Sequence, residues 1–217
     1  MKKKISILVL FLLVFSVYAQ RRTLEVTKPR MNGDDVKKVQ KELVELGFTE
    51  VGEIDGYYGP KSEGAVKELK SLIGFPVNGY VNEYLYDFLE SKDSDLIFDA
   101  IKVYNQNKNK SEQIVYEEGY DFYSRDVKIF ELSDSAYFFI ETESTAYNPD
   151  GGGLDPWDTT AEYEYRTNYT SHIMIGKDLF QLKEGKLEKA EDADFYINLI
   201  NDYKENNRHK QHVRTSQ

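Results

Sequence analysis

Two short turns carry the residue types in this sequence that are best suited to binding a polar ligand. In the first turn, Asp55 offers a carboxylate that can accept hydrogen bonds from hydroxyl or peptide groups, and Tyr57 offers a ring that can stack on a sugar. In the second turn, Asn78 and Tyr80 stand at similar places. We therefore take Asp55, Tyr57, Asn78 and Tyr80 as the candidate ligand-binding residues.

A structural role explains much of the first turn equally well. Asp55 can cap its own turn, Gly56 can supply a positive φ angle, and Tyr58 can fill the core between helices. For Tyr58 and the glycines this explanation is sufficient. A buried Tyr58 requires Tyr57 to point away from the core, which makes Tyr57 the preferred binding candidate of this turn.

Helices are expected on both sides of the first turn and after the second. Apolar residues recur there at spacings of three and four, which is typical of one face of an α-helix. Gly47 and Gly74 are placed to end the first two helices, and Pro60 is placed to begin the second, because a first helical residue needs no N–H group. The apolar positions are Val36, Val39, Leu43 and Leu46, then Ala65, Val66, Leu69, Leu72 and Ile73, and finally Leu85, Tyr86, Phe88 and Leu89.

These residues resemble the peptidoglycan-binding domain of cell-wall proteins, a small three-helix module. The resemblance rests on Gly33-Asp34-Asp35-Val36, Val39-Gln40, Leu43, Leu46-Gly47-Phe48, Asp55-Gly56-Tyr57-Tyr58-Gly59, Ala65-Val66 and the stretch from Asn78-Gly79 to Leu89. It implies a module over residues 24–90 that attaches without catalysis to peptidoglycan, through its glycan or its stem peptide. The sequence departs from the family where Asn78 replaces a usual Asp and Lys70 replaces a usual Gln.

A second candidate site is the loop around the glycine run 151–153. Its carboxylates, Asp150, Asp155 and Asp158, are the kind of oxygen ligand that Ca²⁺ prefers, although their spacing does not fit an EF-hand. Trp157 can instead form a platform for a sugar. A plain hairpin connection is the third explanation. The sequence leaves these three alternatives open.

The apolar period changes from nearly four to two near residue 113, which is typical of β-strands. Expected strand runs are 114–116, 127–132, 136–142, 161–170, 172–175 and 179–182, with turn signals at Glu118-Gly119, Ser133-Asp134, Gly176-Lys177 and Glu184-Gly185-Lys186. Amphipathic helices are expected near residues 96–104 and 190–204. We predict an N-terminal all-α three-helix module followed, at residues 95–204, by an α+β domain with an antiparallel sheet and no recognised family. Residues 205–217 are expected to form a disordered basic tail.

The N-terminus has the pattern of a secretory signal peptide over residues 1–19. Three lysines precede an apolar run from Ile5 to Tyr18 that is too short to span a membrane. We therefore predict an exported protein of the periplasm, the cell envelope or the medium, with no stable membrane insertion after cleavage. The chain has 38 acidic and 28 basic residues and a formal charge of −10, which disfavours nucleic acid as a partner. Another envelope protein is a possible partner.

Most catalytic mechanisms are disfavoured by missing residue types. The sequence has no Cys for a thiol nucleophile, and its three His residues are too few for a zinc hydrolase. A glycosidase needs only two carboxylates about 5–10 Å apart, and an acidic chain offers many pairs. Those considered are Glu141, Glu143, Asp155, Asp158, Glu162 and Glu164. The sequence favours a non-enzymatic protein without cofactor or metal; the alternatives are a peptidoglycan-degrading glycosidase and a protein–protein adaptor on the same fold.

Overall fold

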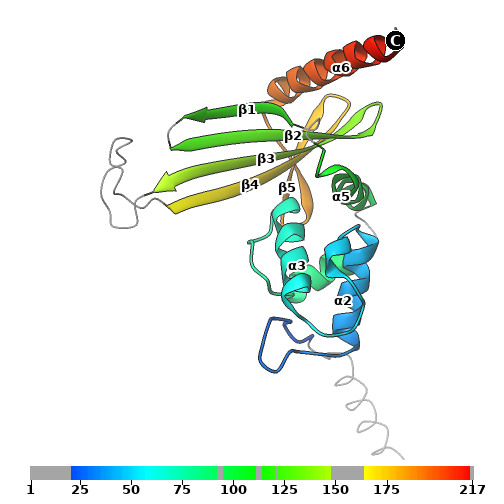
Figure 1. Cartoon of the computed structure of the whole chain (residues 1–217), viewed down its shortest axis with the longest axis vertical. Coiled ribbons are helices and arrows are strands. Elements are labelled where there is room, and N and C mark those ends of the chain that lie inside the picture. Colours follow the sequence, from blue (N-terminus) through cyan, green and yellow to red (C-terminus); the bar gives the residue numbers. More distant parts are fainter. Residues whose placement is uncertain (1–20, 92–94, 111–113, 121, 148–163, 216–217) are drawn as a thin grey trace, which may run out of the picture.

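The computed structural model describes residues 21–91, 95–110, 114–120, 122–147 and 164–215 (Figure 1). Helices come first: α2 (Asp34–Glu45), the 3₁₀-helix η1 (Thr49–Val51), α3 (Pro60–Leu72), α4 (Glu83–Glu90) and α5 (Asp95–Asn107). The strands are β1 (Ile114–Tyr120), β2 (Tyr123–Ser133), β3 (Ala136–Tyr147), β4 (Glu164–Ile175), β5 (Asp178–Lys183) and β6 (Lys186–Lys189), and α6 (Ala193–Thr215) follows them. The predicted fold class, helices followed by an α+β arrangement with an antiparallel sheet, is confirmed.

The helices of the N-terminal part begin and end for local reasons that the sequence predicts. Gly47 after α2 and Gly74 after α3 have φ angles of 94° and 72°, a left-handed conformation that glycine adopts without a steric penalty. Pro60 is the first residue of α3. Asn82 caps α4, because its side chain accepts a hydrogen bond from the backbone N–H of Leu85 at 3.2 Å. These signals hold the two turns between defined helix ends.

All neighbouring strands are antiparallel, and their order in the sheet is their order in the sequence. Three details differ from the prediction. The runs 161–170 and 172–175 belong to a single strand over their described residues, because β4 continues without a break to Ile175. Glu118 and Gly119 form no turn but pair within β1 opposite Arg125 and Ser124. The strand β6 was not predicted, since its four residues show no apolar alternation.

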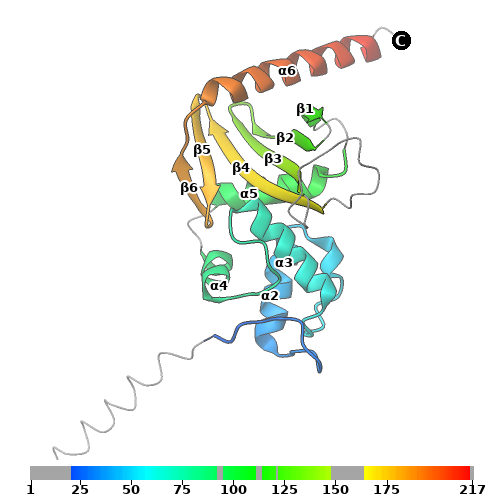
Figure 2. The ribbon, with the colours of Figure 1, turned by 90° about the vertical axis from the view of Figure 1, so that its left-hand side faces the viewer.

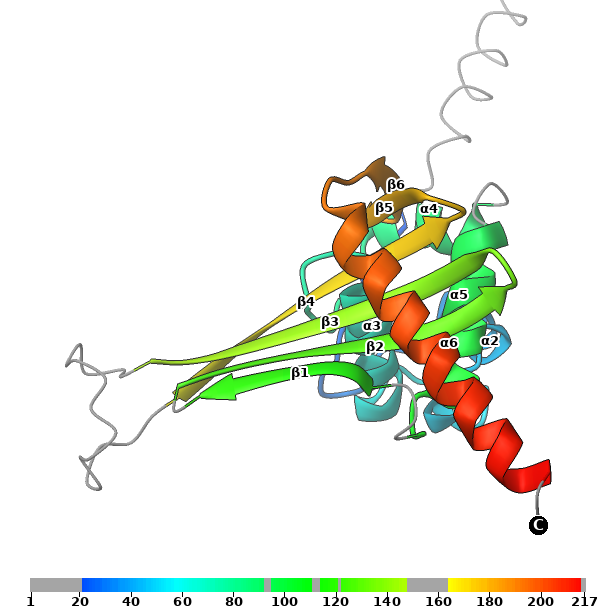
Figure 3. The same cartoon turned by 90° about the horizontal axis from the view of Figure 1, so that it is seen from above.

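The two faces of the sheet are covered by different helices (Figures 1 and 3). One, the module face, lies toward α3 and α5, and the other, the α6 face, lies under α6. The module face contributes Phe130, Phe138, Ile140, Ile173 and Leu182 to the same buried core as the helices. The α6 face joins Val127, Ile129, Tyr137, Phe139, Met174 and Leu179 to Tyr196, Leu199 and Ile200. Helical part and sheet therefore share one core, and their division into domains at residues 24–90 and 95–204 stays a prediction.

The ends of β1 to β4 extend beyond the helices as an arm (Figure 3). In β4, residues 164–169 are all exposed, whereas 171–174 are buried. The sequence alternates most clearly in the exposed part, which no described helix buries. In residues 164–169, alternation therefore indicates a strand but does not indicate that one face of it is buried.

The last helix is longer than predicted. The sequence predicts a helix that ends at Lys204 and a disordered tail after it, whereas α6 continues to Thr215. The stretch from 205 to 215 has no Gly or Pro, the two residues that most disfavour a helix interior. The predicted signal peptide at residues 1–19 and the loop with Asp150, Asp155, Trp157 and Asp158 lie outside the described residues. Among the described helices, none is long and apolar enough to cross a membrane.

Candidate functional site

Asp55 organises the hydrogen bonds of the first turn. Its Oδ1 accepts hydrogen bonds from Gln40 Nε2 and from the backbone N–H of Tyr57, both at 2.9 Å. Gln40 Oε1 in turn accepts one from the N–H of Gly56 at 2.8 Å. The bonds from Gln40 and Tyr57, with a smaller contribution from the charge of Arg30, lower the pKa of Asp55. Asp55 thus shapes its own turn and keeps an exposed negative charge there.

The second turn repeats this pattern with different residues. Asn78 Oδ1 accepts hydrogen bonds from Lys70 Nζ at 2.5 Å and from the backbone N–H of Tyr80 at 3.3 Å. In both turns, a helical side chain and the N–H two residues later meet on one side-chain oxygen. The charges differ, because a neutral Gln40 faces an anionic Asp55, while a cationic Lys70 faces a neutral amide. The two departures from the family pattern thus meet in one contact.

Lys70 is a buried cation, with only 2% of its surface exposed. Burial lowers its pKa, because the ammonium group loses hydration and gains no charged partner. The second turn therefore rests on an amine that is costly to keep charged.

Tyr58 joins the two turns. Its side chain is fully buried, and its hydroxyl donates a hydrogen bond to the carbonyl oxygen of Gly79 at 2.7 Å. Tyr57 and Tyr80, by contrast, are exposed by 50% and 48%. The predicted opposition of Tyr57 and Tyr58 is therefore present. The structure brings the two turns together through Tyr58 and leaves one tyrosine of each turn facing solvent.

A hairpin of the sheet docks on the helical part at the C-terminal end of α3. At the β5–β6 turn, the N–H of Gly185 donates a hydrogen bond to the carbonyl oxygen of Ile73 at 2.8 Å. The N–H of Glu184 donates one to the carbonyl oxygen of Gly74 at 3.3 Å. Gly185 has a φ angle of 71°, and a Cβ there would lie 2.6 Å from Phe88 Cδ2. Only glycine fits this approach without displacing Phe88.

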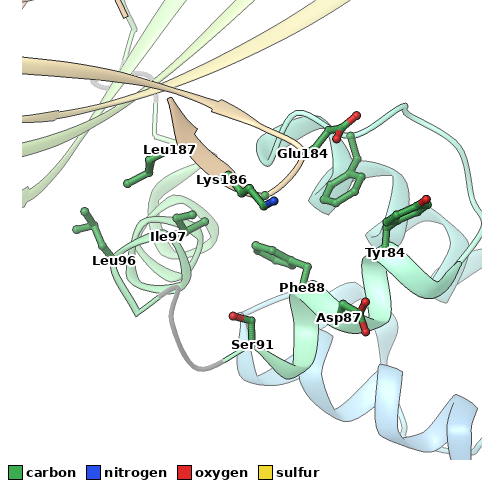
Figure 4. A pocket seen from close by; sticks show the side chains of 11 residues that line it. Tyr84, Asp87, Phe88, Ser91, Leu96, Ile97, Glu184, Lys186 and Leu187 are labelled. Carbon is green, nitrogen blue, oxygen red and sulfur yellow. The ribbon is translucent and has the colours of Figure 1, made fainter. Parts of the chain in front are cut away.

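A pocket of about 630 Å³ opens at this junction between α4, α5 and the hairpin (Figure 4). Tyr84 and Phe88 supply aromatic surface, and Glu184 and Lys186 face them from the hairpin. Asp87, which also lines the pocket, accepts a hydrogen bond from Arg21 Nη1 at 2.8 Å. The pocket has room and mixed chemistry, but none of the four predicted binding residues lines it.

A polar group that the sequence did not reveal lies on the α6 face. Glu141 accepts a hydrogen bond from Arg125 Nε at 2.6 Å on one oxygen and one from Tyr196 Oη at 3.0 Å on the other. Tyr196 Oη also lies 2.9 Å from His172 Nδ1. Because a hydroxyl has one proton, donation to Glu141 requires His172 to carry its proton on Nδ1. Glu141 and Tyr196 are 55 residues apart, and no sequence pattern connects them.

In this group His172 is not placed to activate a serine nucleophile. Burial lowers the pKa of His172 to about 4, against the attraction of Glu141, so its ring is neutral at pH 7. Ser171 is the neighbouring residue in β4, so its side chain points to the opposite face of the sheet. It is buried, and its hydroxyl has no hydrogen-bond partner among the described residues. It therefore cannot serve as a nucleophile activated by His172. Both oxygens of Glu141 are already occupied as acceptors.

Of the other carboxylates considered for a glycosidase, Glu143 and Glu164 lie in the described part of the chain. Glu164 accepts a hydrogen bond from the hydroxyl of Tyr147, and Glu143 lies 4.0 Å from Arg125 Nε. Asp155, Asp158 and Glu162 lie outside the described residues. No group of three or more His, Asp or Glu residues in the described ranges is placed to hold a metal ion.

Comparison with known proteins assigns the helical part. Residues 32–89 match the family described as "Putative peptidoglycan binding domain". The match spans α2, α3, both turns and nearly all of α4, which confirms the resemblance found in the sequence. No curated protein and no solved structure matches the chain. The sheet, α5 and α6 lie outside the matched residues.

Proposed function

We propose, from the peptidoglycan-binding domain at residues 32–89, that this is an exported, non-catalytic protein that holds its sheet at the bacterial cell wall. The helical module binds peptidoglycan, and the sheet is the part that the module tethers. Its place is the periplasm or another part of the cell envelope, after removal of residues 1–19.

The observation that carries this proposal is the pair of linked turns within the matched residues. Tyr57 and Tyr80 each present an aromatic ring to solvent beside an Asx residue, and Tyr58 holds the two turns together. Exposed rings can stack on sugars, and the carboxylate of Asp55 can accept hydrogen bonds from hydroxyl or peptide groups. The turns together offer one rim of a shallow site for glycan or stem peptide.

Affinity at such a site is modest, because a shallow rim buries little of its ligand. Retention at the wall is then expected to depend on the high local density of repeated sites in an insoluble polymer. Binding by the module is therefore sufficient to hold the sheet at the wall, and no chemical step is required.

Sedimentation with insoluble peptidoglycan tests the proposal. The purified protein is compared with Tyr57→Ala and Tyr80→Ala, and soluble muropeptides are assayed in the same tubes. The matched control is Tyr84→Ala, which removes an exposed tyrosine of the same module that lines the junction pocket instead. We expect co-sedimentation without muropeptide release, weakened by about three- to tenfold in Tyr57→Ala or Tyr80→Ala.

Each result has a separate meaning. Equal loss in Tyr84→Ala would place binding at the junction pocket instead of the turns. Release of muropeptides would contradict the non-catalytic role and favour the glycosidase alternative. Absence of sedimentation would leave the protein–protein adaptor as the better explanation of the fold.

A further inference from the structure

A cleft lies between the matched module and the sheet, outside the two turns. It has a volume of about 430 Å³ and is bounded by α3 on one side and by the module face of the sheet on the other. Figure 2 shows α3 lying beneath β4. Its walls include Lys67 and Val77 from the matched residues, Tyr104 from α5, and Lys128, Thr142 and Tyr169 from the sheet.

We propose that this cleft binds the glycan strand of peptidoglycan and extends the turn site onto the sheet, with Tyr169 as a stacking platform. The inference rests on the proposed function and deepens it, because it makes the sheet part of the wall-binding surface. A ligand that crosses the second turn would then contact β4 as well.

The cleft is continuous with the second turn. Val77, which lines the cleft and is 53% exposed, directly precedes Asn78. Gly79 packs so closely on Glu63 of α3 that a Cβ there would overlap the Glu63 side chain. The second turn is therefore pressed against the helix that forms one wall of the cleft, with no helix or strand between them. A polymer bound at the turn has a direct path into the cleft.

The module face of the arm, which continues from the cleft at Tyr169, has the chemistry that sugars require. Tyr169 is 44% exposed, and alternation places Thr167 and Tyr165 on the same face of β4. The hydroxyl groups of Thr167 and Ser144 lie 3.0 Å apart between the two tyrosines. Tyr165 and Tyr169 are four residues apart, which separates their Cα atoms by about 13 Å. Rings that alternate with hydroxyl groups suit stacking and hydrogen bonding along a sugar polymer better than a wholly apolar partner.

The opposite face of the same arm supplies a matched control. Tyr147 pairs with Glu164 across the strands and donates its hydroxyl to that carboxylate. Arg166 lies 4.3 Å above its ring. These contacts put Tyr147 on the α6 face, away from the cleft. Tyr147→Ala therefore removes a tyrosine from the arm without touching the proposed platform.

The test measures binding isotherms of the purified protein with insoluble peptidoglycan. Wild type is compared with Tyr169→Ala, Tyr169→Phe, Tyr147→Ala and Tyr57→Ala, and circular dichroism checks that each variant is folded. We expect the Kd to rise roughly three- to tenfold in Tyr169→Ala and to stay near the wild-type value in Tyr147→Ala. Tyr169→Phe keeps the ring and is expected to bind like wild type.

The outcomes separate this inference from the proposed function. Wild-type affinity in Tyr169→Ala, together with weakened binding in Tyr57→Ala, would overturn the cleft and leave the turn site intact. Equal weakening in Tyr147→Ala would overturn it too, because binding would not depend on the module face. Failure of the wild-type protein to sediment would overturn the proposed function and the cleft with it.

Discussion

Lys70 and Asn78 form the contact in the second turn that Gln40 and Asp55 form in the first, with the charge moved from the turn to the helix. Lys70 donates to Asn78 across 2.5 Å, and Gln40 donates to Asp55 across 2.9 Å. The buried ammonium group of Lys70 thus has a neutral acceptor. Burial lowers the pKa of Lys70, and this acceptor carries no negative charge that would offset the effect.

Asn78→Asp is expected to stabilise the protein, because it gives Lys70 a charged acceptor. A hydrogen bond to a charged group contributes more than one to a neutral group, so we expect a gain of about 1 kcal/mol in the free energy of unfolding. Urea unfolding at pH 7 measures it. In the Lys70→Met background the same substitution should give no gain, and an equal gain there would contradict the assigned contact.

Tyr58→Phe is expected to loosen the link between the two turns. It removes the hydrogen bond to Gly79 and leaves a buried carbonyl unpaired, which costs about 1–2 kcal/mol. Tyr57→Phe is the matched control, because its exposed side chain should change stability by less than about 0.5 kcal/mol. Urea midpoints compare the two variants, and similar values for both would argue against the link.

Gly185→Ala is expected to disturb the docking of the β5–β6 hairpin. The added Cβ would lie 2.6 Å from Phe88 Cδ2, in addition to the cost of a left-handed residue, which is about 1–2 kcal/mol. Gly176→Ala carries only the second cost, since nothing lies within 4 Å of a Cβ at that turn. Thermal unfolding should therefore show a lower Tm for Gly185→Ala than for Gly176→Ala, and equal values would show that Phe88 yields freely.

His172 is expected to make stability depend on pH below neutrality. Burial lowers its pKa in the folded protein from the ordinary 6.5 to about 4. Between these values the unfolded chain binds a proton that the folded protein does not, so stability is lost as the pH falls from 6.5 to 4. The loss is at most about 3 kcal/mol.

Urea midpoints measured from pH 4 to pH 7 check this dependence. The ring faces Glu141, Arg125 and Tyr196, and His172→Gln removes only the imidazole from that group. The variant should show a flatter profile than wild type over this range. A profile as steep as that of wild type would assign the dependence to other groups.

The helices and the two turns could be predicted because their signals are local. Gly47, Pro60 and Gly74 act through φ angles or a missing N–H, and the apolar stripes repeat within single helices. The opposition of Tyr57 and Tyr58 also follows from adjacent positions. The lack of apolar partners predicts a disordered tail, whereas α6 continues to Thr215 through a stretch without Gly or Pro.

Contacts between distant segments were decided by the tertiary structure alone. The hydrogen bond between Tyr196 and Glu141 spans 55 residues, and the docking of Gly185 on Ile73 brings the sheet to the end of α3. Alternation in β4 specifies a strand, but burial needs a second layer, and no described helix buries residues 164–169. Sequence patterns therefore determine which elements form, whereas only the packing of layers determines which faces stay open for a ligand.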